Sequence, residues 1–267
     1  MDRSMYIDDE LSNIPGLKGK SIVVTGAGAG MGRSAAFILA SSGAKLTLAD
    51  INEAAGQETE DLIRKVGGAA IFVRTDVASE TAVQGLVAAA VKLYGRLDGA
   101  FNNAAVLQYG PFHETSGEEF RRVLDVNTAG VFYCMKHEII EMLKTGGGAI
   151  VNTSSLTGIA AFGDNAAYCA SKFGVVGLTL TAAHDYGDRG IRANCLCPGR
   201  TDTSMAVSVG KTARRFDRLK QIPLGRAAMP REQAQAAAWM LSDGASYVSG
   251  VIMPVDGGLM SGPYYKV

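Results

Sequence analysis

The sequence is poor in the residues that build metal centres and disulfide frameworks. Its 267 residues include three histidines, which are scattered and show neither metal-ligand nor catalytic-triad spacing. Four cysteines are present, without metal-ligand spacing and without the pattern of a small disulfide-rich domain. We therefore expect no metal site and reduced, structural cysteines. The residues concerned are His113, His137 and His184, together with Cys134, Cys169, Cys195 and Cys197.

The chain also lacks an excess of charge of either sign and a long hydrophobic run. Lys plus Arg and Asp plus Glu number 26 each, so bulk electrostatics give no reason to expect a nucleic acid or an anionic membrane as partner. No apolar run approaches the length of a membrane span, and residues 1–19 hold no apolar core of signal-peptide length. We expect a cytoplasmic protein that binds neither nucleic acid nor a membrane.

Short β-branched runs alternate with helical segments along most of the chain. Such alternation predicts an α/β fold, a doubly wound parallel sheet with helices on both faces. Because no linker or repeat interrupts it, we predict a single domain over residues 18–267, preceded by an N-terminal extension over residues 1–17. The expected strands are 21–25, 45–49, 69–74, 97–101, 148–153 and 191–196, and the expected helices are 32–42, 52–66, 79–94 and 116–144, followed by one that carries Tyr168.

A glycine-rich loop joins the first expected strand to the first expected helix. It runs from Thr25 to Gly32, where Gly26 permits a tight turn, Gly30 a close approach of the backbone to a pyrophosphate, and Gly32 close packing of helix on strand. Asp50 ends the second strand, at the distance at which an acidic residue accepts hydrogen bonds from both ribose hydroxyls of NAD. Since its carboxylate would repel a 2'-phosphate, and neither Ile51 nor Asn52 is basic, the sequence favours NAD over NADP. A plain helix-capping role for Asp50 explains less.

A second motif combines Ser155, Tyr168 and Lys172. Tyr168 and Lys172 are four residues apart, so on a helix their side chains share one face. A nearby ammonium lowers the pKa of a phenol from its usual value of about 10, which can make the phenol a base. Ser155 follows an apolar run, at the strand end where α/β sheets bind ligands. Taken alone, such a pair is more often a partly buried aromatic beside a solvated amine.

Taken together, these motifs resemble the short-chain dehydrogenase/reductase family in its compact, single-domain, Rossmann-like form. The resemblance covers nearly the whole chain, from Lys18 to Leu259. The order of the motifs along the chain makes it specific, where the glycine loop or the Tyr168 and Lys172 pair alone would not. The residues that carry it are Thr25–Gly32, Asp76, Val77, Asn102, Asn103, Ala104, Asn127, Ser155, Tyr168, Lys172, Pro198, Gly199 and Asp256–Gly258.

The resemblance implies hydride transfer between a nicotinamide and a secondary alcohol or ketone. Tyr168 would act as acid and base, Lys172 would hold the nicotinamide ribose and depress the pKa of Tyr168, and Ser155 would bind the substrate oxygen. Asn127 would support a water relay from Lys172 to solvent, and the alternative is an asparagine that kinks its helix by bonding to its own backbone. The cofactor-binding residues implied are Gly26, Gly28, Gly30, Met31, Gly32, Asp50, Ile51, Asp76, Val77, Asn103, Ala104, Tyr168, Lys172, Pro198, Gly199, Thr201 and Thr203.

The same resemblance sketches a substrate pocket. Its mostly apolar lining favours a hydrophobic or alicyclic secondary alcohol. Two positions depart from the family pattern. Ala105 stands where a glycine is usual, and Arg200 follows Pro198 and Gly199, where an apolar residue is common. Arg200 either binds an anionic substrate group or turns outward to pair with a carboxylate such as Asp202, and the outward orientation is favoured. The substrate residues implied are Leu107, Ser155, Leu156, Phe162, Arg200 and Met205.

Other functions remain open at this point. An NADPH-dependent ketoacyl-type reductase is disfavoured by Asp50. A non-catalytic NAD-binding sensor on the same fold is disfavoured by the presence of Ser155, Tyr168 and Lys172. An isomerase or lyase with tightly held NAD would need an added substrate domain. The family also implies a homotetramer, with the tail from Ser261 to Val267 packed across an interface. Substrate identity, stereochemistry and physiological direction are not determined by these motifs.

Overall fold

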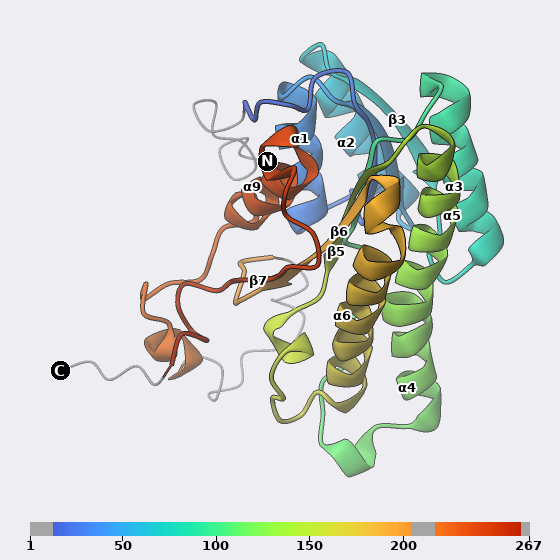
Figure 1. Cartoon of the computed structure of the whole chain (residues 1–267). Coiled ribbons are helices and arrows are strands. Elements are labelled where there is room, and N and C mark those ends of the chain that lie inside the picture. The colour runs from blue at the N-terminus through green and yellow to red at the C-terminus, as the bar shows by residue number, and fades with distance from the viewer. Residues whose placement is uncertain (1–12, 204–216, 263–267) are drawn as a thin grey trace.

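A parallel sheet of seven strands forms the centre of the molecule (Figure 1). The computed structural model describes residues 13–203 and 217–262. The strand order is β3-β2-β1-β4-β5-β6-β7, and every neighbouring pair is parallel. This confirms the predicted α/β class and its doubly wound sheet. The strands are β1 Ser21–Thr25, β2 Lys45–Asp50, β3 Ala69–Arg74, β4 Gly99–Asn102, β5 Gly148–Thr153, β6 Ile191–Pro198 and β7 Ile252–Val255.

Helices cover both faces of this sheet. On one face α1 packs beside α9, and on the other lie α3, α5 and α6 (Figure 1). The sequence pattern did not identify α9 or β7, because the segment after β6 lacks a clear apolar period. The helices are α1 Gly30–Ser41, α2 Glu53–Lys65, α3 Glu80–Tyr94, α4 Gly117–Leu124, α5 Gly130–Lys144, α6 Ala166–Tyr186 and α9 Pro230–Leu241.

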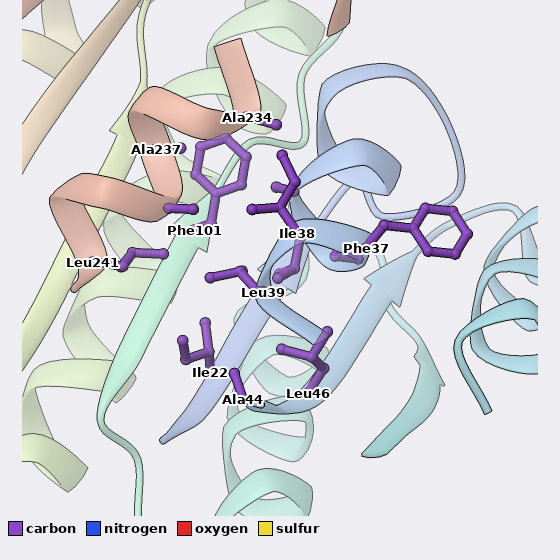
Figure 2. Packing of buried hydrophobic residues seen from close by; sticks show 14 of the residues in the cluster. Ile22, Phe37, Ile38, Leu39, Ala44, Leu46, Phe101, Ala234, Ala237 and Leu241 are labelled. Atoms are coloured by element: carbon purple, nitrogen blue, oxygen red, sulfur yellow. The ribbon is translucent and has the colours of Figure 1, made fainter. Parts of the chain in front are cut away.

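The largest apolar cluster lies under α1 and α9 (Figure 2). Ile22 and Leu46 project into it from adjacent strands, Leu39 from α1 and Leu241 from α9, and each is almost completely buried. Burial of one such side chain contributes about 1.5–3 kcal/mol. Leu17, inside the predicted N-terminal extension, is also fully buried in this cluster. The residues just before β1 therefore pack as part of the folded domain.

The segment predicted as one long helix up to Lys144 contains a widened turn. Ser116 caps α4 by accepting a hydrogen bond from the Glu119 amide at 3.1 Å, as the capping pattern predicted. Between α4 and α5, the residues Asp125–Ala129 form a π-helical turn. Asn127 lies inside that turn and is completely buried. Turns of this kind occur frequently at functional sites.

Helix α6 corrects one expectation from the sequence. With its continuation to Arg189 it is long and apolar enough to cross a membrane by length and composition, although no sufficient run was identified from the sequence. One such helix is weak evidence for a span, because core helices of globular domains pass the same test. Here α6 packs against β6, α4 and the π-helical turn Asp125–Ala129. It also carries Tyr168 and Lys172.

Candidate active site

A cavity of about 450 Å³ opens at the carboxyl ends of the central strands. Its wall combines the glycine loop after β1, the ends of β2, β5 and β6, and the start of α6. Most of the site residues expected from the sequence therefore meet in one place. Those in the wall are Gly26, Gly30, Met31, Asp50, Asn103, Ala104, Leu107, Ser155, Leu156, Phe162, Tyr168, Lys172, Pro198, Gly199, Arg200, Thr201 and Thr203.

The glycine loop forms a cradle that a larger residue would fill. Gly26 adopts a φ of 66°, in the left-handed region that favours glycine. A Cβ on Gly32 would lie 2.1 Å from the Gly26 carbonyl oxygen, and one on Gly28 would lie 2.8 Å from the Asp50 carboxylate. Helix α1 starts at Gly30, within this glycine-rich stretch, and its N-cap residue Ala29 offers no side-chain cap. Free amides at a helix N-terminus suit a phosphate, so the loop fits the pyrophosphate of a dinucleotide.

Asp50 is held with its carboxylate at the cavity. One oxygen accepts the Gly28 amide at 2.8 Å, and the other accepts the Asn52 amide at 2.9 Å. Asp50 does not cap α2, because that helix is capped by Asn52, whose side chain accepts from the Ala55 amide at 3.2 Å. The capping alternative for Asp50 is therefore wrong. Its position leaves the carboxylate fixed beside the glycine loop, where a ribose would lie.

The basic residue that follows the loop, Arg33, forms hydrogen bonds with helix α2. Arg33 comes directly after Gly32, and its side chain is only 3% exposed. Its guanidinium donates to the Glu58 carboxylate at 2.6 Å and to the Ala55 carbonyl at 3.1 Å. Arg33 does not contribute to the cavity wall in the described part of the chain. Asp50 therefore supplies the acidic group on the ribose side of the cavity wall.

Tyr168 and Lys172 lie together at the cavity, as their spacing predicted. The Lys172 amine donates to the Thr153 carbonyl at 2.8 Å and lies 5.6 Å from the centre of the Tyr168 ring. Burial lowers the pKa of Lys172 to about 8. Burial also raises the pKa of Tyr168 to about 12, partly offset by a hydrogen bond with Ser155. Burial is the dominant cause of the shift and Lys172 is not among the causes, so the depression of the Tyr168 pKa by Lys172 that the resemblance implies is not seen here.

The Asn127 side chain connects the π-helical turn to the loop that holds Val106 and to helix α6. Its side chain bonds both ways to Val106, accepting the amide at 2.8 Å and donating to the carbonyl at 2.9 Å. It also donates to the Ser171 hydroxyl at 3.0 Å, which in turn donates to the Tyr168 carbonyl at 2.7 Å. The alternative of bonding to its own backbone is therefore wrong. The water relay remains a prediction, and Asn127 does not contribute to the cavity wall among the described residues.

Several expected cofactor residues lie outside the described cavity wall. At Gly28 and Gly32, an added Cβ would collide with neighbouring atoms of the site. Ile51 is 58% exposed. Asp76 is exposed, with its carboxylate accepting the Ala78 amide at 3.0 Å. Val77 is buried against the start of α5. Their direct roles in binding stay predictions.

The substrate side of the cavity is made by loop side chains, and here the sequence was least informative. Leu107, Leu156 and Phe162 contribute to the wall as expected. Arg200 contributes to it as well, although the outward orientation was favoured from the sequence. Met205 lies outside the described residues, as do residues 263–267 of the tail. Further wall residues were not among the predicted site residues, and most of them occur in loops without periodicity. They are Ala29, Ala105, Tyr109, Thr153, Ser154, Thr157, Asn165, Ile222 and Leu259.

Comparisons with known proteins agree with this geometry. A family model described as Enoyl-(Acyl carrier protein) reductase matches residues 26–260. A 2,5-dichloro-2,5-cyclohexadiene-1,4-diol dehydrogenase of Sphingobium indicum is 46% identical over 246 residues, which cover 91% of this chain and 97% of that relative. A cyclohexanol dehydrogenase of Acinetobacter sp. is 40% identical over 243 residues, covering 91% and 95%.

A solved structure extends the likeness to three dimensions. It is named as an NAD(P)-dependent gluconate 5-dehydrogenase of Beutenbergia cavernae and was solved with bound NADP at low occupancy. It superposes with a TM-score of 0.88 at 33% identity and covers 92% of this chain and 99% of its own. The agreement therefore extends over most of the chain.

Proposed function

The chain belongs to the short-chain dehydrogenase/reductase family, and from that premise we propose that it is an NAD-dependent dehydrogenase that interconverts an alicyclic secondary alcohol and its ketone. The relatives are oxidoreductases that act on secondary alcohols, and two of them are named for six-membered carbocyclic substrates. The mostly apolar substrate wall, with Leu107, Leu156 and Phe162, suits such a ring.

The observation that carries the proposal is the meeting of Ser155, Tyr168 and Lys172 at one cavity. Ser155 and Tyr168 both line this cavity, and the Ser155 side chain is among the causes that act on the pKa of the Tyr168 phenol. A substrate oxygen placed there would be held by Ser155. It would receive a proton from the Tyr168 phenol on reduction, and on oxidation it would give its proton to Tyr168 in the phenolate form. Bound NAD supplies the hydride acceptor of this reaction. Lys172 would hold the nicotinamide ribose.

The preference for NAD rests on Asp50. Its carboxylate is fixed by two backbone amides beside the glycine loop, so it cannot turn away from a 2'-phosphate without losing both bonds. The NADP found in the solved relative makes this the point to test. A reductase that uses NADPH is the competing function.

The test measures formation of the reduced cofactor with NAD and with NADP. The substrates are cyclohexanol, a cyclohexane diol and a hydroxycyclohexanecarboxylate. We expect turnover with NAD and a large preference over NADP. Asp50→Asn should reduce that preference at least about tenfold, since a hydrogen bond to a charged group contributes about 1.5–3 kcal/mol. Glu53→Gln, which changes an exposed acid near Asp50 in sequence, is the matched control. A wild-type preference for NADP would overturn the cofactor assignment.

We further propose that the protein is a homotetramer. Support comes from large apolar side chains exposed on the layer of α4, α5 and α6, which a single subunit leaves in contact with water. Light scattering should give a mass near four times that of the 27.9 kDa chain. A monomeric mass would contradict the proposal. The exposed side chains are Phe120, Phe132, Ile140, Leu143 and Phe173.

A further inference from the structure

The helix that carries Tyr168 is not capped by its own N-cap residue. Helix α6 starts at Ala166, and the side chain of Asn165 makes no capping bond to the first turn. It donates instead to the Gly163 carbonyl at 2.7 Å. The first amides of a helix have no partner within the helix, so they need an acceptor from outside. The first turn of α6 contains Tyr168, the proposed acid-base group, so the amides that need an acceptor lie beside that residue.

Gln108 supplies that acceptor from a distant loop. Its side-chain oxygen accepts the Ala167 amide at 3.1 Å, and its side-chain nitrogen donates to the Thr115 hydroxyl at 3.0 Å. Gln108 is 6% exposed, so few water molecules can replace these bonds. The orientation of the amide follows from the bonding, because the reversed amide would set two donors against each other at Ala167. Gln108 therefore caps α6 one residue before Tyr168.

The same loop forms part of the substrate wall. Leu107 and Tyr109, on either side of Gln108, contribute to the cavity. Two residues later, the Gly110 amide donates to the Asp164 carbonyl at 2.9 Å, which ties the loop to the chain just before α6. One short segment thus contacts both the substrate space and the first turn of the catalytic helix.

We propose that Gln108 is a positioning residue, which sets the place of the Tyr168 hydroxyl in the cavity by capping α6 from the loop of the substrate wall. The inference rests on the proposed function, in which Tyr168 exchanges a proton with the substrate. Without the cap, the first turn of α6 loses an external anchor and the hydroxyl shifts. A displacement of about 1 Å at a reacting group can lower the rate about 10²-fold.

Three variants separate capping from simple packing. Gln108→Leu has a similar volume and removes both hydrogen bonds. Gln108→Glu keeps an acceptor for the Ala167 amide, and its negative charge suits a helix N-terminus. Thr115→Val removes the Thr115 bond but leaves the cap, and Thr115 does not line the cavity. Should Gln108→Leu fail to fold, Gln108→Asn replaces it, because it stays polar but is one methylene too short to reach Ala167.

The readouts are kcat and KM for the best alcohol of the panel, the NADH dissociation constant from fluorescence, and amide hydrogen exchange in the first turn of α6. We expect Gln108→Leu to lower kcat about 10- to 100-fold, with KM and NADH affinity within about threefold of wild type. Exchange in the first turn should be at least about tenfold faster. Gln108→Glu should restore kcat to within about threefold, and Thr115→Val should resemble wild type.

The outcomes also distinguish this inference from the function on which it rests. A folded Gln108→Leu protein with wild-type kcat would overturn the inference alone, provided that wild type is active and Tyr168→Phe is not. Equal defects in Gln108→Leu and Gln108→Glu, or in Thr115→Val, would show that the loop matters through its packing and not through the cap. Absence of wild-type turnover, or an active Tyr168→Phe protein, would overturn the proposed function and this inference together.

Discussion

The two faces of the sheet bury different kinds of side chain. Under α1 and α9 the cluster of Figure 2 is apolar, with Leu39 and Phe101 fully buried. Under α5 and α6 the same depth holds ionisable groups, since Glu138 is 0% and Lys172 1% exposed. Burying a charge costs free energy that burying a leucine does not. The helix that carries Tyr168 lies on the face that holds Glu138 and Lys172, and these ionisable groups are buried there beside a second apolar cluster.

A network of hydrogen bonds offsets part of that cost on the α5 and α6 face. Asn102 donates to the Glu138 carboxyl at 3.0 Å and to the Asn152 side chain at 3.0 Å, and Asn152 donates to the Thr179 hydroxyl at 2.9 Å. These bonds join β4 and β5 to both helices. Burial raises the pKa of Glu138 to about 8, so the carboxyl is mostly protonated at neutral pH.

The largest effect is expected from Tyr168→Phe. Removing a general acid-base group should lower kcat about 10²- to 10⁴-fold. The unfolding free energy should change little, because the ring is retained and the lost hydroxyl faces the cavity. Steady-state kinetics and urea unfolding on the same preparation check both halves of the expectation. A variant with kcat within about tenfold of wild type would contradict the assigned role.

The reverse result is expected on the apolar face from Leu39→Ala. The side chain is fully buried within α1, so its truncation should lower the unfolding free energy by about 2–5 kcal/mol. The kcat of the molecules that remain folded should stay near the wild-type value, because Leu39 is not in the described cavity wall. Urea unfolding and active-site titration measure the two quantities. Large losses of both would show that the two faces are not independent.

The same contrast explains what the sequence could predict. Gly26 and Asp50 act on the cofactor side through backbone shape and a fixed carboxylate at strand ends, so spacing alone located them. Gln108 and Tyr109 belong to a loop without periodicity, and the contact of Gln108 to α6 joins residues about 60 positions apart. No local pattern encodes such a contact.

The sheet was predictable for a related reason. Each strand before β7 carries its own apolar run, whereas α9 and β7 lack a clear apolar pattern in the sequence.

The smallest expected effect tests whether the face of α5 and α6 buries a neutral acid, and it uses the variant Glu138→Gln. The folded pKa of Glu138, about 8, lies above its unfolded value of about 4.5, so the folded state binds more protons in between. This contribution to stability is complete at low pH and is lost as pH rises through 8.

Glu138→Gln is close in shape and cannot titrate, and its amide can still bond to Asn102. The variant should therefore lose this part of the pH dependence. We expect wild type to lose about 1–3 kcal/mol more than the variant between about pH 6 and about pH 8. Urea unfolding at both pH values measures the difference. Glu118→Gln, an exposed acid on α4, is the matched control and should follow wild type. If Glu138→Gln follows wild type as well, then the carboxyl is already ionised in the folded protein and the α5 and α6 face holds a buried charge instead of a neutral acid.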